Sequence, residues 1–210
     1  MTENDITVDE DILHFTLETG RISYRVYQPH VTEIVLGAGC LPEREINLDV
    51  AVKDGISVRR RKGGGGTVVL SPGQVVVTLA ARVSSPFRNT VYMHRINQLI
   101  IDALAELGVT GIEHRGISDL AIGERKILGS SLHRKKLFLF YQSSLLVEND
   151  LLLFERYLKS PPREPEYRKG RSHSEFCTNL RSEGFDITAE EAAEGIRRIM
   201  RNRLAEIENI

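Results

Sequence analysis

Residues 59–67 read RRRKGGGGT, so four consecutive cations run directly into four consecutive glycines. Glycine has no Cβ, and a glycine run can therefore take positive φ and let another group approach the main chain closely. Successive N–H groups in such a turn can converge on an anion, while arginine forks suit carboxylate or phosphate. The stretch predicts a backbone cradle for a small anionic ligand. A flexible, solvated hairpin tip with a basic face is the alternative.

Comparison with known phosphate-binding motifs limits the kind of anion site that the glycine stretch can form, and the overall composition limits the class of partner. No Gly-Lys-Ser/Thr follows the glycines, so the stretch is not a P-loop, and its spacing differs from the dinucleotide fingerprint. The 210 residues are 41% hydrophobic and 27% charged, which is typical of a soluble globular protein. A formal net charge of −1 gives no global reason to expect nucleic acid or a membrane as partner.

The two cysteines and the apolar runs bear on where the protein works. Cys40 and Cys177 lie far apart and form neither a disulfide framework nor a metal-ligand spacing. The sequence shows no signal-peptide pattern and no apolar run of membrane-spanning length. We therefore expect a reduced, cytoplasmic setting.

Strand and helix patterns alternate irregularly along the chain, which predicts an α+β fold with a mixed β-sheet and packed helices. Helices are expected at 9–18, 42–52, 90–107, 150–158 and 188–208, the last with a capping box at Thr188 and Glu191. Residues 161–175 contain three prolines and are predicted to form a mobile surface loop. Strands are expected at 22–27, 33–36, 56–60, 67–70, 75–83, 111–114, 119–122, 127–132 and 137–147.

Four motifs in this order resemble those of the lipoate–protein ligase family and the related octanoyltransferases. They are an Arg-Arg-x-x-Gly-Gly-Gly signature with a following Gly-Gln, an Asp-Leu pair with Lys-Ile-x-Gly-Ser, a strand that normally reads His-Gly-Thr-Leu-Leu, and Thr-Asn-Leu. In this sequence the motifs lie at 60–68 with 72–74, 119–120 with 124–131, 142–146, and 178–180. The resemblance spans roughly residues 9–205.

The resemblance implies the catalytic-domain fold shared with biotin ligases, as one domain over residues 1–210 that ends in the helix at 188–208, without an accessory C-terminal domain. The implied reaction is activation of lipoate by ATP to lipoyl-AMP, then transfer to a lysine of a lipoyl-acceptor protein. A lipoyl domain, a glycine cleavage H protein or a related lipoate-binding protein is the expected acceptor. The chain would work alone or with a separately encoded accessory chain. Mg²⁺ would come with ATP, held mostly by phosphate oxygens and water, so no protein metal cage is expected.

The resemblance assigns catalysis to Lys126, whose point charge would hold the carboxylate against the α-phosphate and then stabilise the oxyanion. The glycine run would lie against the lipoyl chain and acyl phosphate, and Arg60 or Arg61 would neutralise phosphate charge. Gly129, Ser130 and Ser131 would supply nearby donors. The full set of expected binding residues is Arg60, Arg61, Gly63, Gly64, Gly65, Gly66, Thr67, Gln74, Asp119, Gly129, Ser130 and Ser131.

Departures from the family pattern keep other functions open. Leu70 and Ser71 stand where ligases carry His-Asp and octanoyltransferases His-Gly, and Gln142 replaces a second histidine. A non-catalytic lipoyl- or nucleotide-binding homologue is therefore one alternative. Cysteine-dependent acyl transfer is another, although residues 111–117 contain no cysteine and Cys177 lacks a Pro-Cys-Gly setting. A biotin ligase would carry a tryptophan-bearing loop, and the chain has no tryptophan.

Overall fold

The computed structural model describes residues 8–85 and 87–208. Its strands are β1 (Ser23–Tyr27), β2 (Glu33–Leu36), β3 (Ser57–Arg60), β4 (Val68–Leu70), β5 (Gln74–Arg82), β6 (Ile112–Arg115), β7 (Asp119–Ile122), β8 (Arg125–Lys135) and β9 (Phe138–Leu146). Its helices are α1 (Glu10–Thr19), α2 (Pro42–Glu45), α3 (Leu48–Lys53), α4 (Asn89–Glu106), α5 (Leu152–Tyr157), α6 (His173–Phe176), α7 (Ala189–Arg203) and α8 (Ala205–Glu208), with a 3-10 turn at Glu166–Arg168. None of the helices among these residues is long and apolar enough to cross a membrane.

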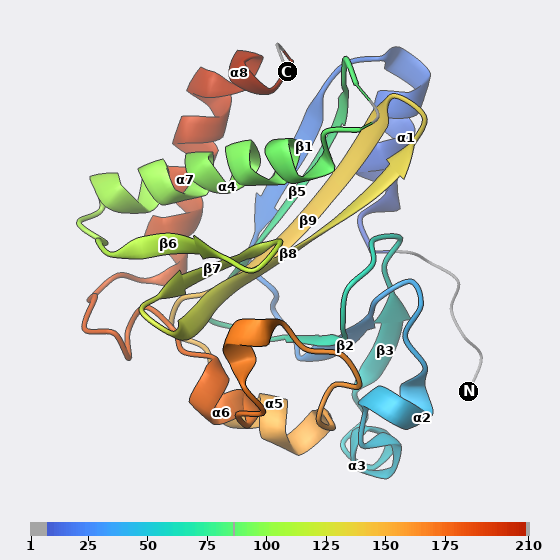
Figure 1. Cartoon of the computed structure of the whole chain (residues 1–210), viewed down its shortest axis with the longest axis vertical. Helices are drawn as coiled ribbons and strands as arrows, with labels where there is room; N and C mark the ends of the chain where they lie inside the picture. The colour runs from blue at the N-terminus through green and yellow to red at the C-terminus, as the bar shows by residue number, and fades with distance from the viewer. Residues whose placement is uncertain (1–7, 86, 209–210) are drawn as a thin grey trace.

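The strands form two sheets (Figure 1). Six of them form an antiparallel sheet in the order β1-β5-β9-β8-β7-β6. The smaller sheet has the order β3-β2-β4, in which β2 pairs parallel with β3 and antiparallel with β4. Strands and helices therefore mix without regular βαβ alternation, and the predicted α+β class with a mixed sheet is confirmed.

Helices α4 and α7 pack against one face of the larger sheet (Figure 1). Leu79 of β5 and Tyr141 of β9 are fully buried there, together with Ile96 of α4 and Ile196 of α7. Because neighbouring residues of a strand point to opposite faces, the residue that follows Tyr141, Gln142, points to the other face. Strand register thus decides which polar residues of β8 and β9 can line a site on that second face.

The second face is partly covered by α1 and by the smaller sheet. Leu13 of α1 packs against Ala80 and Phe140. Val35 and Leu70 of the smaller sheet pack with Val76 of β5 and with Val8, in what we call the apolar cluster. Beyond these contacts, the same face borders a cavity.

The helix expected at 42–52 is divided into α2 and α3. Between them Ile46 forms an isolated bridge with Leu158, and the N–H of Asn47 donates to the carbonyl of Tyr157 at 2.9 Å. These long-range main-chain bonds replace helical ones at the break. Sequence periodicity could not reveal them, because the partner segment lies more than 100 residues away.

The C-terminal helix begins as predicted and ends differently. Thr188 and Glu191 form both hydrogen bonds of the expected capping box. The helix expected to run from 188 to 208 is nevertheless interrupted at Leu204, where α7 ends and the short α8 follows.

Residues 161–176, which we call the wall segment, include the surface loop predicted at 161–175; residues 162–164 are exposed, but other parts of the segment are buried. Arg168 and His173 are only 5% and 8% exposed. The guanidinium groups of Arg168 and Arg171 lie 5.1 and 5.3 Å from the ring centroid of Phe176, a distance at which cations are attracted to an aromatic face. Tyr167 also donates to Asp119, and Arg171 to the carbonyl of Glu124, so contacts with the rest of the fold help to order this segment.

Candidate active site

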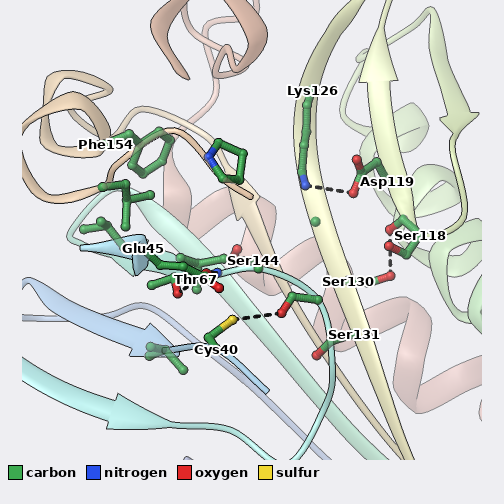
Figure 2. A pocket seen from close by; sticks show the side chains of 18 of the residues that line it. Cys40, Glu45, Thr67, Ser118, Asp119, Lys126, Ser130, Ser131, Ser144 and Phe154 are labelled. Carbon is green, nitrogen blue, oxygen red and sulfur yellow. Dashed lines mark hydrogen bonds and ion pairs between the residues drawn. The ribbon is translucent and has the colours of Figure 1, made fainter. Parts of the chain in front are cut away.

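A cavity of about 800 Å³ lies between the glycine run, the wall segment and the second face of the larger sheet (Figure 2). It brings together most of the residues that the sequence singled out. Expected site residues that line it are Arg61, Gly64, Gly65, Gly66, Thr67, Asp119, Lys126, Gly129, Ser130 and Ser131. Arg60, Gly63 and Gln74 are not part of the lining that the described residues form.

Lys126 forms an ion pair with Asp119 inside this cavity. Its Nζ lies 2.8 Å from Oδ1 of Asp119, and the side chains are 26% and 9% exposed (Figure 2). Oδ2 of the same carboxylate accepts a hydrogen bond of 2.8 Å from the hydroxyl of Tyr167 in the wall segment. Burial, followed by the nearby charge of Asp119, raises the pKa of Tyr167, so the phenol stays protonated and donates. We call these three residues the cavity cluster.

A β-bulge directs Lys126 into the cavity. The register between β7 and β8 shifts between Leu120 and Ala121, which leaves Ile127 as an extra residue on β8. Ile127 is fully buried in the helix-covered core, and the bulge lets Lys126 share a face with Gly129, three residues later. A Cβ on Gly129 would lie 2.8 Å from the lysine Nζ. Glycine is therefore the residue that leaves room for the ammonium.

Arg61 shapes the glycine run from within. Its Nη2 donates to the carbonyls of Gly64 and Gly66 at 2.7 and 2.8 Å, and its Nε donates to Oγ of Ser131 at 3.1 Å. The side chain is 8% exposed, and burial lowers the pKa of the guanidinium, which nevertheless stays protonated as arginines do. Gly63 packs closely on β8, since a Cβ there would lie 2.6 Å from the Ser131 hydroxyl. The glycine run is thus braced by hydrogen bonds from within, although Gly64, Gly65 and Gly66 are themselves exposed.

The expectation that Arg60 or Arg61 neutralises phosphate charge is not supported by these contacts. The guanidinium of Arg61 donates hydrogen bonds to protein oxygens, as described above. Arg60 lies outside the cavity lining, and its Nη1 donates to the carbonyls of Gly37 and Cys40 at 3.0 and 2.9 Å. Gln74 is fully buried and donates to the carbonyl of Val69 at 3.0 Å. Arg60 and Gln74 therefore hold loops next to the cavity in place.

Ser130 and Ser131 were expected to donate to a ligand, and the structure gives their hydroxyls other partners. Register pairs Ser130 with Ser143, so its side chain points away from that of Ser131 although the residue still borders the cavity. Both its N–H and its hydroxyl donate to the carbonyl of Ser118, at 3.1 and 2.7 Å (Figure 2). Ser131 lies on the cavity face opposite Gln142, and its Oγ accepts the hydrogen bond from Arg61. These serines position the main chain around Lys126.

Glu45 and Tyr167 are site residues that sequence reasoning missed. Oε2 of Glu45, at the end of α2, accepts hydrogen bonds from the N–H and the hydroxyl of Thr67, at 3.0 and 2.7 Å (Figure 2). Glu45 is 8% exposed, and its two hydrogen bonds to Thr67 fix the end of the glycine run. Nothing in the sequence pattern distinguishes Glu45 from a surface glutamate of the expected helix. Tyr167 carried a weak signal, because aromatic residues interleaved with arginines are unusual in a solvated proline-rich loop.

Both cysteines line the cavity, and neither is poised as a nucleophile. Burial raises the pKa of the Cys177 thiol to about 11, although the charge of Lys126 acts in the opposite direction. Cys40 donates its Sγ–H to the carbonyl of Gly65 at 3.3 Å, and burial raises its pKa as well. Because the thiolate is the reactive form, both thiols are largely unreactive at neutral pH.

The cavity combines two kinds of surface. One part is the apolar cluster with Val8, Val35, Leu70 and Val76, and another carries the ammonium of Lys126. Ligand cavities commonly pair apolar walls with a few polar groups that fix orientation. An acyl chain that ends in an anionic group has the matching chemistry.

Comparisons with known proteins agree with this geometry. A model of the lipoyl protein ligase A/B catalytic domain family matches residues 4–200. The chain is 24% identical over 206 residues to lipoate-protein ligase A subunit 1 of Thermoplasma acidophilum, covering 94% of this chain and 78% of that protein.

Solved structures share the fold. The chain superposes with a TM-score of 0.77 on a lipoate-protein ligase A bound with ATP, at 23% identity over 94% of this chain and 78% of the other. A bi-partite lipoate protein ligase from Thermoplasma acidophilum gives 0.75, at 24% identity over 88% and 72%. Likeness at this level of identity confirms the predicted lipoate-ligase fold. With the family match extending over nearly the whole chain, the protein belongs to the lipoyl protein ligase A/B catalytic domain family.

Proposed function

We propose that this protein activates lipoate with ATP to lipoyl-AMP and then transfers the lipoyl group to a lysine of a lipoyl-acceptor protein. One observation carries the proposal: the Lys126 ammonium and the glycine run line the same cavity. A cation and a stretch of main chain without side chains are what an acyl phosphate needs around it. Family membership supports the same activity.

In the activation step, the acyl chain would occupy the apolar cluster and its carboxylate would meet Lys126. An ammonium has three N–H donors. Asp119 is the side chain paired with Nζ among the described residues, which leaves donors for a substrate carboxylate and the α-phosphate. The carboxylate oxygen attacks the α-phosphorus, and pyrophosphate leaves. Lys126 lowers the repulsion between the two anions as they approach.

In the transfer step, the acceptor amine attacks the lipoyl carbonyl and AMP leaves. Negative charge develops on the carbonyl oxygen, and a preorganised ammonium stabilises it in the low-dielectric cavity. Gly129 makes space for that ammonium, since a side chain there would meet Nζ. The same lysine would thus serve both steps.

Mg²⁺ would accompany ATP and neutralise phosphate charge. The described residues contain no group of three or more His, Cys, Asp and Glu side chains that could bind a metal ion. Single carboxylates do line the cavity at Glu45, Asp119 and Glu164, and Mg²⁺ is typically bound by one or two carboxylates with phosphate oxygens and water. This donor set fits a metal that is carried in by the nucleotide.

The alternatives are less well supported. A cysteine-thioester transferase needs a thiolate, and burial of Cys177 works against one. The replaced histidines do not argue strongly for a non-catalytic protein, because Leu70 belongs to the apolar cluster and Nε2 of Gln142 donates to the carbonyl of Val8. Both positions are explained by packing beside the acyl-chain part of the cavity.

Partners follow from the same proposal. The Thermoplasma relative is named as a subunit, and its solved system comprises a bi-partite ligase and an E2 lipoyl domain. We therefore expect this chain to act as one catalytic domain, in the cytoplasm, on a lipoyl domain, a glycine cleavage H protein or a related lipoate-binding protein. A separately encoded accessory chain would assist it.

The test is to incubate the purified protein with ATP, Mg²⁺ and lipoate or octanoate, and to measure pyrophosphate release and the acyl-AMP by mass spectrometry. Lys126→Ala should abolish most of the release, whereas Lys135→Ala, at the exposed end of the same strand, should not. Absence of adenylate, with and without a candidate accessory chain, would overturn the ligase assignment. Transfer of octanoate from a carrier protein to Cys177 would instead establish the transferase.

A further inference from the structure

We propose that Tyr167 is a positioning residue for Lys126 and acts through the carboxylate of Asp119. The inference rests on the proposed function, because it assumes that Lys126 serves the reaction. Neither the sequence motifs nor the family comparison assigns a role to Tyr167, which lies in a segment that the sequence marked only as a loop.

The cavity cluster divides one carboxylate between two partners. Oδ2 of Asp119 accepts from the Tyr167 hydroxyl and Oδ1 holds Nζ of Lys126, both at 2.8 Å. Rotation of the carboxylate would break the bond to the phenol. The phenol therefore fixes the direction of Oδ1, and with it the resting position of the ammonium.

Tyr167 is itself held from several sides. Its ring centroid lies 5.0 Å from that of Phe176, and the ring borders the turn before β7, where a Cβ on Gly116 would be 3.6 Å from it. Its carbonyl accepts from Nη2 of Arg171 at 2.7 Å. A donor fixed in this way can orient a carboxylate, whereas an exposed tyrosine could not.

The arrangement also explains how Lys126 can be released. When the ammonium turns to a substrate anion, Asp119 loses one partner while its side chain stays largely buried. An ionised, buried carboxylate without any hydrogen bond is strongly unfavourable. Tyr167 keeps Oδ2 satisfied, so the exchange of Lys126 from carboxylate to substrate becomes easier.

Tyr167→Phe keeps the ring and removes only the hydroxyl. We expect the kcat of adenylation to fall about tenfold, the effect of losing one hydrogen bond to a charged group, with KM for lipoate and ATP little changed. Tyr157→Phe is the matched control, because its hydroxyl donates to Asp54 at 2.9 Å outside the cavity lining. It should leave kcat unchanged.

A double-mutant cycle separates positioning from general packing. If Tyr167 acts through Asp119, Tyr167→Phe should have no further effect on kcat in an Asp119→Ala protein, or in Asp119→Asn if the alanine variant does not fold. Independent, multiplying losses would overturn the inference, as would an active parent whose kcat Tyr167→Phe does not lower. A parent that forms no adenylate would instead refute the proposed function, and the role of Tyr167 with it.

Discussion

Several clusters among the described residues join a cation, a carboxylate and a phenol, and two of them differ clearly in what the cation can do. The surface cluster consists of Arg156, Asp54 and Tyr157, and the cavity cluster of Lys126, Asp119 and Tyr167. In the surface cluster a single oxygen, Oδ2, accepts from Nε and Nη2 of the arginine at 2.7 and 2.6 Å and from the phenol at 2.9 Å. In the cavity cluster each carboxylate oxygen has one partner.

The choice of cation explains the difference. A guanidinium is a rigid planar fork, so Arg156 binds through two nitrogens and joins α5 to α3. An ammonium is a compact charge on a flexible stem and can exchange one acceptor for another. Lys126 sits in a cavity with room made by Gly129, whereas Arg156 is 53% exposed. An ion pair indicates a functional site when its cation is free to change partners within a cavity.

The largest expected effect separates the two cations. Lys126→Ala should lower the rate of pyrophosphate release about 10²–10³-fold, because a preorganised charge is lost from the transition state. Arg156→Ala should leave the rate unchanged, since the surface cluster does not line the cavity. An equal loss of rate in the two variants would show that the difference between the two clusters does not matter for the reaction.

A buried arginine extends the comparison to stability. Arg61→Lys should lower the free energy of unfolding by about 2–4 kcal/mol, because an ammonium cannot reach the carbonyls of Gly64 and Gly66 together with the Ser131 hydroxyl. Urea denaturation measures this. Arg156→Lys is the control and should keep the midpoint of the parent. A parent-like midpoint for Arg61→Lys would mean that the glycine run is not braced from within.

Gly129→Ala moves the lysine without removing it. The new Cβ would lie within 3 Å of Nζ and Cε of Lys126, the flexible end of the side chain, so the lysine can yield while the fold is kept. We expect kcat to fall about tenfold or more from misplacement of the charge, with an unchanged melting temperature. A loss of activity that tracks a loss of thermal stability would contradict this reading.

The smallest effect concerns Cys177. Its thiol has a pKa of about 11, so the thiolate fraction at pH 7 is about 10⁻⁴, and alkylation by iodoacetamide should still be rising well above pH 9. The charge of Lys126 lowers this pKa, so Lys126→Ala should shift the alkylation profile to higher pH and Arg156→Ala should not. Cys177→Ser should adenylate lipoate like the parent. Fast alkylation at pH 7 would restore the thioester alternative.

Much of the fold was predictable because its signals are local. The apolar run of β5 and the 3.6-residue periodicity of α4 identify these elements within a residue or two of their bounds. The break between α2 and α3 was not predictable, since it depends on pairing with residues near 158. The buried part of the wall segment was missed for the same reason, because its hydrogen bonds to Asp119 and Glu124 are not local.

How much of the site could be predicted depends on the same distinction between local and long-range signals. Motifs pointed to Lys126 and the glycine run, which do line one cavity. The bulge that brings Lys126 and Gly129 to one face leaves no trace in the sequence pattern, and neither does the register that turns Ser130 to the opposite face. Arg61 was predicted to bind phosphate because its type suits an anion; it lines the cavity, and its buried guanidinium donates to the main chain of the glycine run, which the sequence did not indicate.

Main-chain hydrogen bonds beside the α2–α3 break join two segments that line the cavity. Ile46 bridges to Leu158, and the N–H of Lys159 donates to the carbonyl of Glu45 at 2.9 Å. The carboxylate of that same glutamate grips Thr67. Through its main chain and its side chain, Glu45 thus connects the segment at residues 158–159 to Thr67, at the end of the glycine run. Moving these two segments apart would strain the hydrogen bonds of Glu45. A ligand that displaces one segment would therefore also displace the other.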